Sequence, residues 1–414
     1  MNLAKGYGGL GFPALPGHGP ALGCRGETHK SYDYKSEAVM VRSRKKRIAL
    51  MLNILAPYRI PLIRRLADNF WLRLMLSGEE SNRSVWDEYI RSKLAELQIE
   101  SERVWGLTLA IPRLSKGKLF DRRYVHINPG YLTALLRFRP DGVITNEMGF
   151  RSAVAVLYGY LFRKPVWVWW GGTLHTERGI GPIKRLWRKV FVRVVRRWIS
   201  YGRTSTEYLL SLGVPRKRIL QIQNCVDERL FVEQHSPALQ IAPKPVLLYV
   251  GQLIKRKGVD LLLIAAAKVQ AKGYQFSLLI VGSGPEQANL ESLAKRLGLK
   301  NVLFLKERIP SEMAGIYRSA DVLVFPTLED VWGLVVNEAL WSGLPALVSK
   351  YAGCAPELVP ETNVFDPLRP EDFEAALERA VRREIALPDL SRLIPCEKVA
   401  EMLILDIKAE LGDT

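Results

Sequence analysis

The sequence predicts an α/β protein built from two doubly wound domains with parallel sheets. From Arg47 onward, short apolar runs alternate with helical patterns, which is typical of parallel strands covered by helices. The alternation lapses and prolines appear within residues 227–244, and the pattern restarts at Val246. At 414 residues the chain has the length for two domains with complete cores.

Each expected strand is a short apolar run that a helical pattern separates from the next run. In the first domain these runs cover residues 48–52, 71–76, 104–107, 142–145, 166–169 and 199–202. In the second domain they cover residues 246–250, 276–281, 302–305, 322–325 and 346–349. Ligands of doubly wound sheets bind beyond the carboxyl ends of the strands, so we expect the functional loops there.

The same pattern sets the expected domain boundaries. Residues 1–40 are rich in Gly and Pro and lack apolar periodicity, which predicts a disordered leader. The other expected segments are a first domain at 41–226, a link at 227–244, a second domain at 245–395 and a C-terminal helix at 396–414. Met40 directly precedes a basic run and the first strand, so two explanations stay open: Met40 is the natural start, or the leader is a genuine flexible tail.

The composition limits the classes of protein to which this chain can belong. Apolar residues make up 48% and charged residues 25% of the chain, as in soluble globular proteins, and the longest apolar run, 153–162, is too short to span a bilayer. No secretory signal is visible, and four scattered cysteines form no metal spacing, so we expect a cytoplasmic protein. The net charge of +18 predicts an anionic partner; nucleic acid is disfavoured because no binding motif accompanies the charge.

The most informative stretch is 326–339, which contains two carboxylates, Asp330 and Glu338. It follows an expected strand and leads into a helix that starts near Gly333, whose free N–H groups suit a phosphate. One carboxylate before this anion site and one inside its helix can hold sugar hydroxyls on either side of a diphosphate. Two acids at this spacing also occur on ordinary solvated helix faces, so the neighbouring residues decide the interpretation.

The second domain opens with a strand, a glycine turn and a basic cluster that ends in Lys257-Gly258. A fixed cation here would stabilise the negative charge that builds on a departing nucleoside diphosphate. Gly282 and Gly284 follow the next strand and permit close approach of the backbone, although a lone Gly-x-Gly is weak support by itself.

With its Asp330 and Glu338 separated by seven residues, Trp332-Gly333-Leu334 between them and Ser342-Gly343-Leu344-Pro345 after them, the chain resembles the retaining GT-B glycosyltransferases of family 4. This resemblance implies two Rossmann-like domains facing across a cleft, with a last helix that crosses back to the first domain. It also implies that the first carboxylate contacts the donor sugar and the second the ribose. Asp330 replaces the commoner Glu, Trp332 the usual Phe and Gln252 the usual Arg.

The resemblance supplies the remaining donor-site assignments and a mechanism without a metal or other cofactor. The expected donor-binding residues are Gly251, Gln252, Lys257, Gly282, Arg308, Ile309, Asp330, Trp332, Gly333, Leu334, Val335 and Glu338. Arg308 and Ile309 would lie near the base, and Lys255 or Arg256 would compensate for Gln252. The donor would be a UDP- or GDP-sugar.

The first domain is expected to hold the acceptor and one catalytic side chain. A Pro-Tyr-Arg turn after the first strand resembles one subgroup of the family and, with Trp170, gives the acceptor set Asn53, Tyr58, Arg59 and Trp170. The alternative for this turn is a packed Tyr58 and a solvated Arg59. His175 is the one histidine that follows a strand end beside glycines, and with Asp330 and Lys257 it completes the expected catalytic set; Glu177 is a weaker candidate.

Residues 182–198 predict a basic amphipathic helix. The apolar positions are 183, 186, 187, 190, 191, 194, 195 and 198, and we expect this face to pack on the first sheet. The opposite face carries Lys184, Arg185, Arg188, Lys189, Arg193, Arg196 and Arg197 and is expected to meet water or anionic lipid. With the basic run at 42–47, it predicts peripheral binding to the cytoplasmic face of the inner membrane and a lipid-linked acceptor.

We therefore predict a retaining glycosyltransferase that moves a sugar from a nucleoside-diphosphate donor to a lipid-linked or polysaccharide acceptor in cell-surface glycan synthesis. Two alternatives stay open. One is a nucleotide-sugar epimerase of GT-B-like fold, which needs no acceptor. The other is a non-catalytic basic scaffold at the membrane, which Gln252 and Asp330 would favour if they mark a degenerate site.

Overall fold

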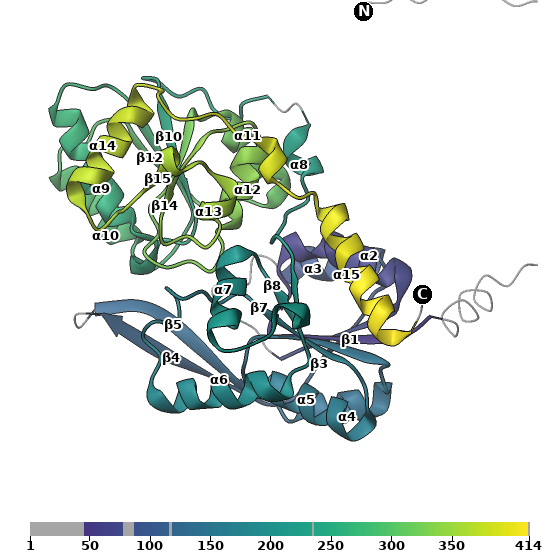
Figure 1. The fold of residues 1–414 in the computed structure, drawn as a ribbon. Coiled ribbons are helices and arrows are strands. Elements are labelled where there is room, and N and C mark those ends of the chain that lie inside the picture. Colours follow the sequence, from purple (N-terminus) through teal and green to yellow (C-terminus); the bar gives the residue numbers. More distant parts are fainter. Residues whose placement is uncertain (1–44, 78–86, 116–117, 234–235, 413–414) are drawn as a thin grey trace, which may run out of the picture. The chain divides into compact units, whose positions relative to one another are not determined.

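The computed structural model describes residues 45–77, 87–115, 118–233 and 236–412. The expected leader and residues 42–44 of the basic run at 42–47 lie outside the described residues. The residues from Lys45 onward form one compact unit that contains two parallel sheets (Figure 1). This architecture confirms the predicted α/β class with two doubly wound sheets, while the predicted domain boundaries stay a prediction.

The first sheet has seven parallel strands in the order β3-β2-β1-β6-β7-β8-β9. At its centre Leu50 lies opposite Leu74 on one neighbour and Ile144 on the other. The strands are β1 (Arg47–Leu52), β2 (Trp71–Leu76), β3 (Glu100–Arg103), β6 (Gly142–Asn146), β7 (Val166–Trp170), β8 (Arg197–Ser200) and β9 (Ile219–Gln221).

Helices cover both faces of the first sheet because alternate residues of each strand point to opposite sides. Ile48 and Leu50 join one core cluster with α2, α3 and α15, whereas Ala49 and Met51 join another with α4 and α5. The helices are α2 (Ile60–Asn69), α3 (Asp87–Glu96), α4 (Gly130–Phe138), α5 (Phe150–Phe162), α6 (Pro182–Val194), α7 (Arg203–Ser211) and α15 (Cys396–Leu411), with the short turn η1 (Pro57–Arg59).

The second sheet has six parallel strands in the order β12-β11-β10-β13-β14-β15, with the order reversing between β10 and β13. Leu247 and Tyr249 face a core shared with α9, α10 and α14, and Leu248 faces a core shared with α11 and α12. The strands are β10 (Val246–Val250), β11 (Ser277–Val281), β12 (Val302–Leu305), β13 (Val322–Phe325), β14 (Ala346–Ser349) and β15 (Val364–Phe365).

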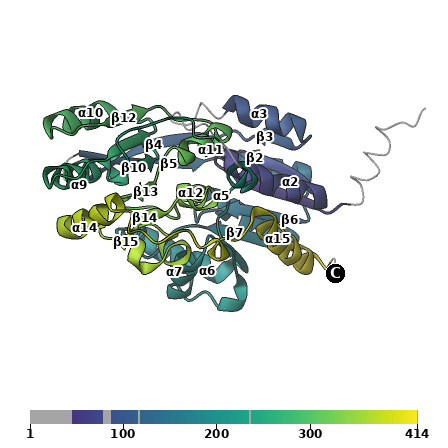
Figure 2. The ribbon, with the colours of Figure 1, turned by 90° about the horizontal axis from the view of Figure 1, so that it is seen from above.

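The helices of this second half lie in two layers, which Figure 2 shows on either side of the strands. They are α8 (Arg229–Val232), α9 (Val259–Ala271), α10 (Gln287–Arg296), α11 (Pro310–Arg318), α12 (Leu334–Trp341), α13 (Ala355–Leu358) and α14 (Pro370–Val381). The short turns are η3 (Arg216–Arg218), η4 (Lys255–Lys257), η5 (Glu361–Asn363) and η6 (Leu390–Arg392).

Two predicted elements of the first domain are wrong in detail. The run at 104–107 is not a sheet strand: β3 ends at Arg103, and an antiparallel ribbon of β4 (Leu107–Ser115) and β5 (Lys118–Ile127) follows. The basic helix α6 ends at Val194 rather than at Trp198, because the chain turns there into β8.

The orientation of α6 also differs from the prediction. The residues that it buries are Arg188, Phe191 and Val192, whereas Ile183 and Leu186 on the expected packing face are exposed. Arg188 is accommodated because its guanidinium pairs with Glu177 and stacks 4.6 Å from the ring centroid of Trp170. The buried ion pair of Arg188 with Glu177 therefore determines which face of α6 points into the domain.

The last helix, α15, packs against α2 and the first sheet (Figure 1). Val399, Leu403 and Ile407 are buried in the core cluster that contains Ile48. The carboxylate of Asp406 accepts a 2.8 Å hydrogen bond from the indole N–H of Trp167 and pairs with Arg197. The C-terminal segment is thus fastened to strands β7 and β8 as well as to α2.

We predict that Asp406→Ala lowers the free energy of unfolding by about 2 kcal/mol, because it leaves the buried Trp167 N–H and the Arg197 guanidinium without their shared acceptor. Urea denaturation followed by far-UV circular dichroism measures this change. Glu401→Ala on the same helix is the control, since Glu401 makes only an exposed pair with Lys398 and should leave the midpoint unchanged. Equal effects of both substitutions would contradict the fastening role of Asp406.

Candidate nucleotide-sugar site

The loops after β10, β11 and β13 meet at the carboxyl edge of the second sheet. Gly251 and Gly282 have φ angles of +150° and +146°, and a Cβ on Gly282 would lie 2.0 Å from the carbonyl oxygen of Gly251. A Cβ on Gly258 would lie 2.3 Å from the carbonyl oxygen of Pro326. Glycines at these points therefore let three loops approach one another closely. Their predicted approach to a phosphate stays a prediction.

Lys257 and Asp330 form an ion pair at this edge. Lys257 ends η4 and Asp330 lies in the loop after β13, and both side chains are largely buried. Burial opposes ionisation of Asp330, but the nearby Lys257 and Arg256 outweigh it and hold the pKa of the Asp330 carboxyl below its usual range. The second oxygen of Asp330 accepts a 3.1 Å hydrogen bond from the backbone N–H of Trp332. Lys257 and Asp330 thus form a fixed charge pair beside the start of α12.

Glu338 lies on α12, one turn into the helix whose N-cap is Gly333. The hydroxyl of Tyr317 donates a 2.5 Å hydrogen bond to this carboxylate. Burial raises the pKa of Glu338 to about 7, and the bond from Tyr317 only partly offsets that effect. Leu334 and Val335, both half-buried, form the first turn, where backbone N–H groups have no partner within the helix. In the sequence, this turn lies between Asp330 and Glu338.

His175 reaches the same loop from the first half of the chain. Its Nε2 lies 2.9 Å from the carbonyl oxygen of Leu328, which requires the proton on that nitrogen, and its ring stacks on Tyr351 with centroids 4.3 Å apart. Burial lowers the pKa of His175, so the imidazole is neutral at neutral pH. The structure therefore brings all three expected catalytic residues to one loop, because His175 contacts Leu328, two residues before Asp330.

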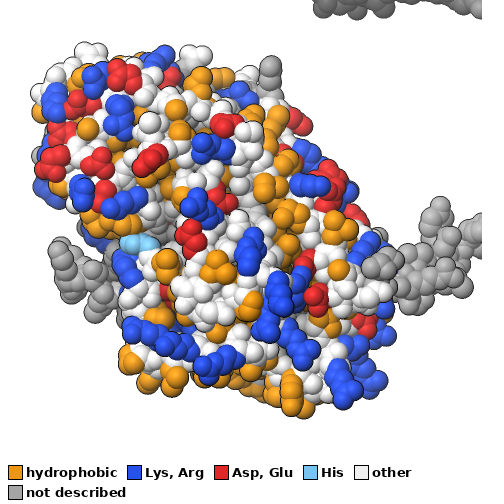
Figure 3. Space-filling model, viewed as in Figure 1, with side chains coloured by type: hydrophobic (Ala, Val, Ile, Leu, Met, Phe, Trp, Pro, Cys, Tyr) orange, Lys and Arg blue, Asp and Glu red, His pale blue; other side chains and the backbone are white. Residues whose placement is uncertain are grey.

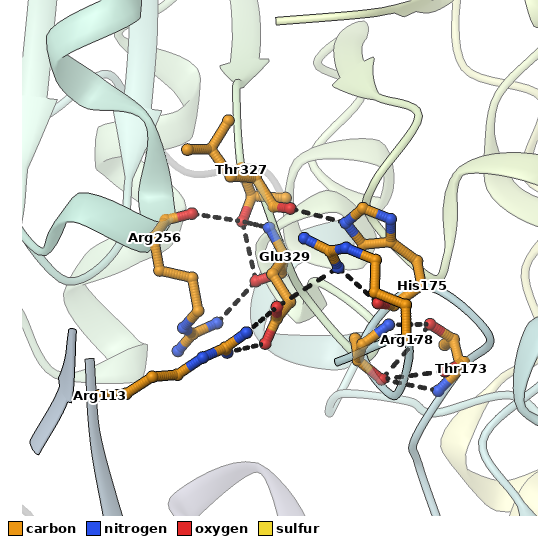
Figure 4. A network of polar contacts seen from close by, with 9 residues as sticks. Arg113, Thr173, His175, Arg178, Arg256, Thr327 and Glu329 are labelled. Atoms are coloured by element: carbon orange, nitrogen blue, oxygen red, sulfur yellow. Dashed lines mark hydrogen bonds and ion pairs between the residues drawn. The ribbon is translucent and has the colours of Figure 1, made fainter. Parts of the chain in front are cut away.

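Sequence reasoning missed the residue next to Asp330. The carboxylate of Glu329 accepts two hydrogen bonds from the guanidinium of Arg113, at 2.6 and 3.0 Å, and lies 3.5 Å from Arg178 (Figure 4). Arg256 donates to the carbonyl oxygen of Glu329 at 2.7 Å. Arg113 belongs to β4, which is 216 residues away in sequence, so no local signal indicated this contact.

Several expected contact residues are buried in the core instead. Trp332 is 1% exposed and its indole N–H donates to Asn337 at 2.8 Å. Trp170 stacks on Tyr208, the guanidinium of Arg188 lies 4.6 Å from the Trp170 ring centroid, and Trp170 is also buried. Neither ring presents a surface to a ligand, so Trp332 supports the donor loop and Trp170 supports the first domain. Both aromatic residues were assigned from position alone, which does not reveal the direction of a side chain.

The Pro-Tyr-Arg turn differs from the interpretation in which Arg59 is solvated. Arg59 is buried rather than solvated, with its guanidinium 4.8 Å from the ring centroid of Trp169 and bonded to the hydroxyl of Tyr201. Tyr58 is half-buried beside it, and Asn53 is half-buried at the end of β1. These residues lie at the carboxyl edge of the first sheet, which is where an acceptor is expected.

The remaining expected residues follow strands β10 and β12 of the second sheet. Arg308 and Ile309 are exposed just before α11, and Gln252 is half-buried, with its backbone carbonyl accepting from Tyr249. A hollow of about 330 Å³ lies near the start of α11 and is lined by Asp227, Arg229, Leu230, Glu233 and Ser311. Glu177, the weaker catalytic candidate, is instead the partner of Arg188. Among the described residues, no group of three potential ligands is arranged to hold a metal ion.

The sequence of the second half is similar to a known family. Residues 232–394, which are less than half of the chain, match the family described as glycosyl transferases group 1. We call these residues the group 1 region. The group 1 region contains Lys257, Asp330 and Glu338, whereas His175 and Arg113 lie outside it.

Curated relatives match limited stretches of the chain. An uncharacterized glycosyltransferase of Methanocaldococcus jannaschii is 34% identical over 140 residues, which are 33% of this chain and 35% of that protein. A GDP-mannose-dependent α-(1-6)-phosphatidylinositol dimannoside mannosyltransferase of Mycobacterium tuberculosis is 30% identical over 202 residues, which are 49% of each chain. The matches thus span between a third and a half of these two relatives' own length.

Solved structures extend the similarity to both halves. HepE of Anabaena in complex with UDP and glucose superposes with a TM-score of 0.61 at 16% identity, and the match covers 88% of this chain and 98% of that chain. At this identity the likeness shows the fold alone, and that fold is GT-B. Both halves of the described chain, and not only the group 1 region, therefore share the arrangement that the sequence resemblance implied.

We predict that donor binding to the group 1 region strengthens about ten-fold between pH 6 and pH 8, as Glu338 ionises through its pKa of about 7 and gains acceptors for ribose hydroxyls. Glu338→Gln should bind more weakly and without this pH dependence. Titration calorimetry at a series of pH values measures both.

The pH dependence of the free energy of unfolding provides a second test of the Glu338 pKa. Because the folded pKa of Glu338 lies above its ordinary value of 4.5, ionisation costs stability as pH rises from 4.5 to about 7. Glu338→Gln should therefore be more stable than the wild type above pH 7. Glu357→Gln is the matched control, because the pKa of Glu357 is also raised to about 7 by burial but its carboxylate accepts from the backbone of Arg203 on α7. That control should retain pH-dependent donor binding.

A double-mutant cycle tests the Lys257–Asp330 pair. Lys257→Met should cost about 3 kcal/mol of stability, because it leaves the buried Asp330 carboxylate without its closest cation. Lys257→Met combined with Asp330→Leu should recover most of this loss, since no buried charge then remains unpaired. We expect neither variant to bind a donor diphosphate, and wild-type affinity in the double variant would exclude Lys257 from diphosphate binding.

Proposed function

We propose that this protein is a retaining glycosyltransferase that moves a sugar from a nucleoside-diphosphate donor to a lipid-linked or polysaccharide acceptor. The observation that carries the proposal is the placement of Lys257, Asp330 and Glu338 around the first turn of α12. One cation, one helix N-terminus and two carboxylates match the parts of a nucleotide sugar: its diphosphate, its sugar and its ribose. The group 1 family match of residues 232–394 supports the same reaction class.

Each side chain has a proposed role in that reaction. Lys257 and the N–H groups at the start of α12 stabilise the charge that develops on the leaving diphosphate, so the positive charge comes from the protein rather than from a metal. Lys257 has three N–H donors, so it can contact a phosphate and keep its bond to Asp330. Glu338 accepts hydrogen bonds from the ribose hydroxyls. Asp330 and the neutral His175 orient the sugar as it acquires oxocarbenium character.

The donor and acceptor classes follow from chemistry and from the relatives. UDP is bound in the HepE structure, and the mycobacterial relative is named for GDP-mannose and phosphatidylinositol dimannoside. We propose a UDP- or GDP-sugar as donor and a lipid-linked or glycan acceptor, held near Asn53, Tyr58 and Arg59 at the edge of the first sheet. Retention of configuration rests on the sequence resemblance alone.

A calorimetric screen of UDP-, GDP- and ADP-sugars, with and without magnesium, tests this function. We expect micromolar binding of one donor that is unaffected by magnesium and lost in Glu338→Ala, because the ribose loses its acceptor. Glu291→Ala on α10 is the matched control, since Glu291 contacts only Gln287 on its own helix and should bind as the wild type does. If no donor binds, the transferase proposal fails; release of a free epimer without an acceptor would favour an epimerase.

A further inference from the structure

Three neighbouring helices of the first domain, α4, α5 and α6, leave large apolar side chains exposed on the outer face of the sheet. Ile183 on α6 is 85% exposed and Tyr160 on α5 is 82% exposed. The other exposed apolar residues of these helices are Leu136, Phe150, Leu157, Leu161, Phe162, Leu186, Trp187, Val190 and Val194. We name this surface the α4–α6 face.

The exposure on α6 is a consequence of its anchoring. Arg188, Phe191 and Val192 point into the domain, so the stripe of residues 183, 186, 187, 190 and 194 points outward. The indole N–H of Trp187 donates to the carbonyl oxygen of Met148 at 2.9 Å, which fixes its ring between α6 and the start of α5. A helix that met only water would be expected to turn this stripe inward.

All charged residues of the helices α4, α5 and α6 are basic. The three helices contain no Asp or Glu, and exposed basic residues lie in or directly after them. These include Arg139, Arg163, Lys189, Arg193 and Arg196. Figure 3 shows orange side chains along the edge of the molecule where Figure 1 places α5 and α6, with blue side chains beside them.

We propose that the α4–α6 face docks on an anionic phospholipid surface, with the apolar stripe in the acyl boundary and the basic side chains at the headgroups. Exposed Leu, Ile and Trp beside Lys and Arg is the pattern of helices that lie in a membrane interface. A second copy of this chain fits less well, because two like faces would bring the same positive charges together. None of the helices formed by the described residues is long and apolar enough to cross a bilayer, so docking is peripheral.

The buried position of Arg188 determines which residues a test of membrane binding should substitute. Arg188 was expected on the lipid-facing side, but it is buried against Glu177 and Trp170, so its substitution would disturb the fold instead. Leu186 and Val190 are exposed and belong to the outward stripe, and Lys189 and Arg193 are exposed charges beside it. These four positions accept polar or acidic side chains without creating a buried charge.

The test is co-sedimentation of the full chain with phosphatidylcholine vesicles, with and without phosphatidylglycerol. We expect binding that requires phosphatidylglycerol and is lost in Leu186→Asp combined with Val190→Asp. Lys189→Glu combined with Arg193→Glu should weaken binding at least about ten-fold, as each basic residue near an anionic surface contributes on the order of five-fold. Leu405→Asp, at an exposed apolar position of α15, is the matched control and should bind as the wild type does.

Each other outcome overturns the proposal. Equal binding of the wild type and the Leu186/Val190 variant would show that the apolar stripe does not contact the membrane. Equal binding to both vesicle types would show that anionic headgroups are not required. A lipid-free dimer that the Leu186/Val190 substitutions dissociate would assign the face to self-association instead. The inference rests on this surface and not on the proposed transfer reaction, so vesicle binding and donor binding in the same variants succeed or fail separately.

Discussion

The buried charge of Glu329 and Asp330 is the constraint on which the candidate site depends. The two carboxylates are neighbours in one loop, yet each is held by a different part of the chain: Lys257 pairs with Asp330, and Arg113 on the β4–β5 ribbon pairs with Glu329. A buried carboxylate is stable only while its partner is present. The loop that carries the proposed donor contact is therefore fixed only when a side chain from the first domain is in place.

His175 adds a second tie of the same kind. Its Nε2 bonds the carbonyl oxygen of Leu328, so three consecutive residues of the loop are each held by a separate partner. Two of these partners, His175 and Arg113, come from the half of the chain expected to bind the acceptor. The donor loop and the acceptor half are thereby coupled, and any change in their separation would alter the position of Asp330.

The sequence predicts the fold well because alternating apolar runs and helical patterns are local properties. It also indicates that Lys257, Asp330 and His175 lie in loops after strand ends and that Glu338 lies in the helix that follows, because these are local features of the pattern. It does not predict the Arg113–Glu329 pair, since the partners are 216 residues apart. Nor does it predict that Trp170 and Trp332 point into cores, because the direction of an aromatic ring depends on packing that only the folded chain defines.

The contact of Arg188 with Glu177 and Trp170 affects both the outer face of the first domain and the loop that contains His175. Arg188 enters the domain because Glu177 neutralises it and Trp170 stacks on it, and this leaves the apolar stripe of α6 outside. Glu177 is two residues from His175 and Trp170 ends the strand before the same loop. The ion pair therefore joins the exposed helix directly to the loop that contacts Leu328. The short segment from Trp170 to Glu177 therefore links the outer face of the first domain to the candidate site.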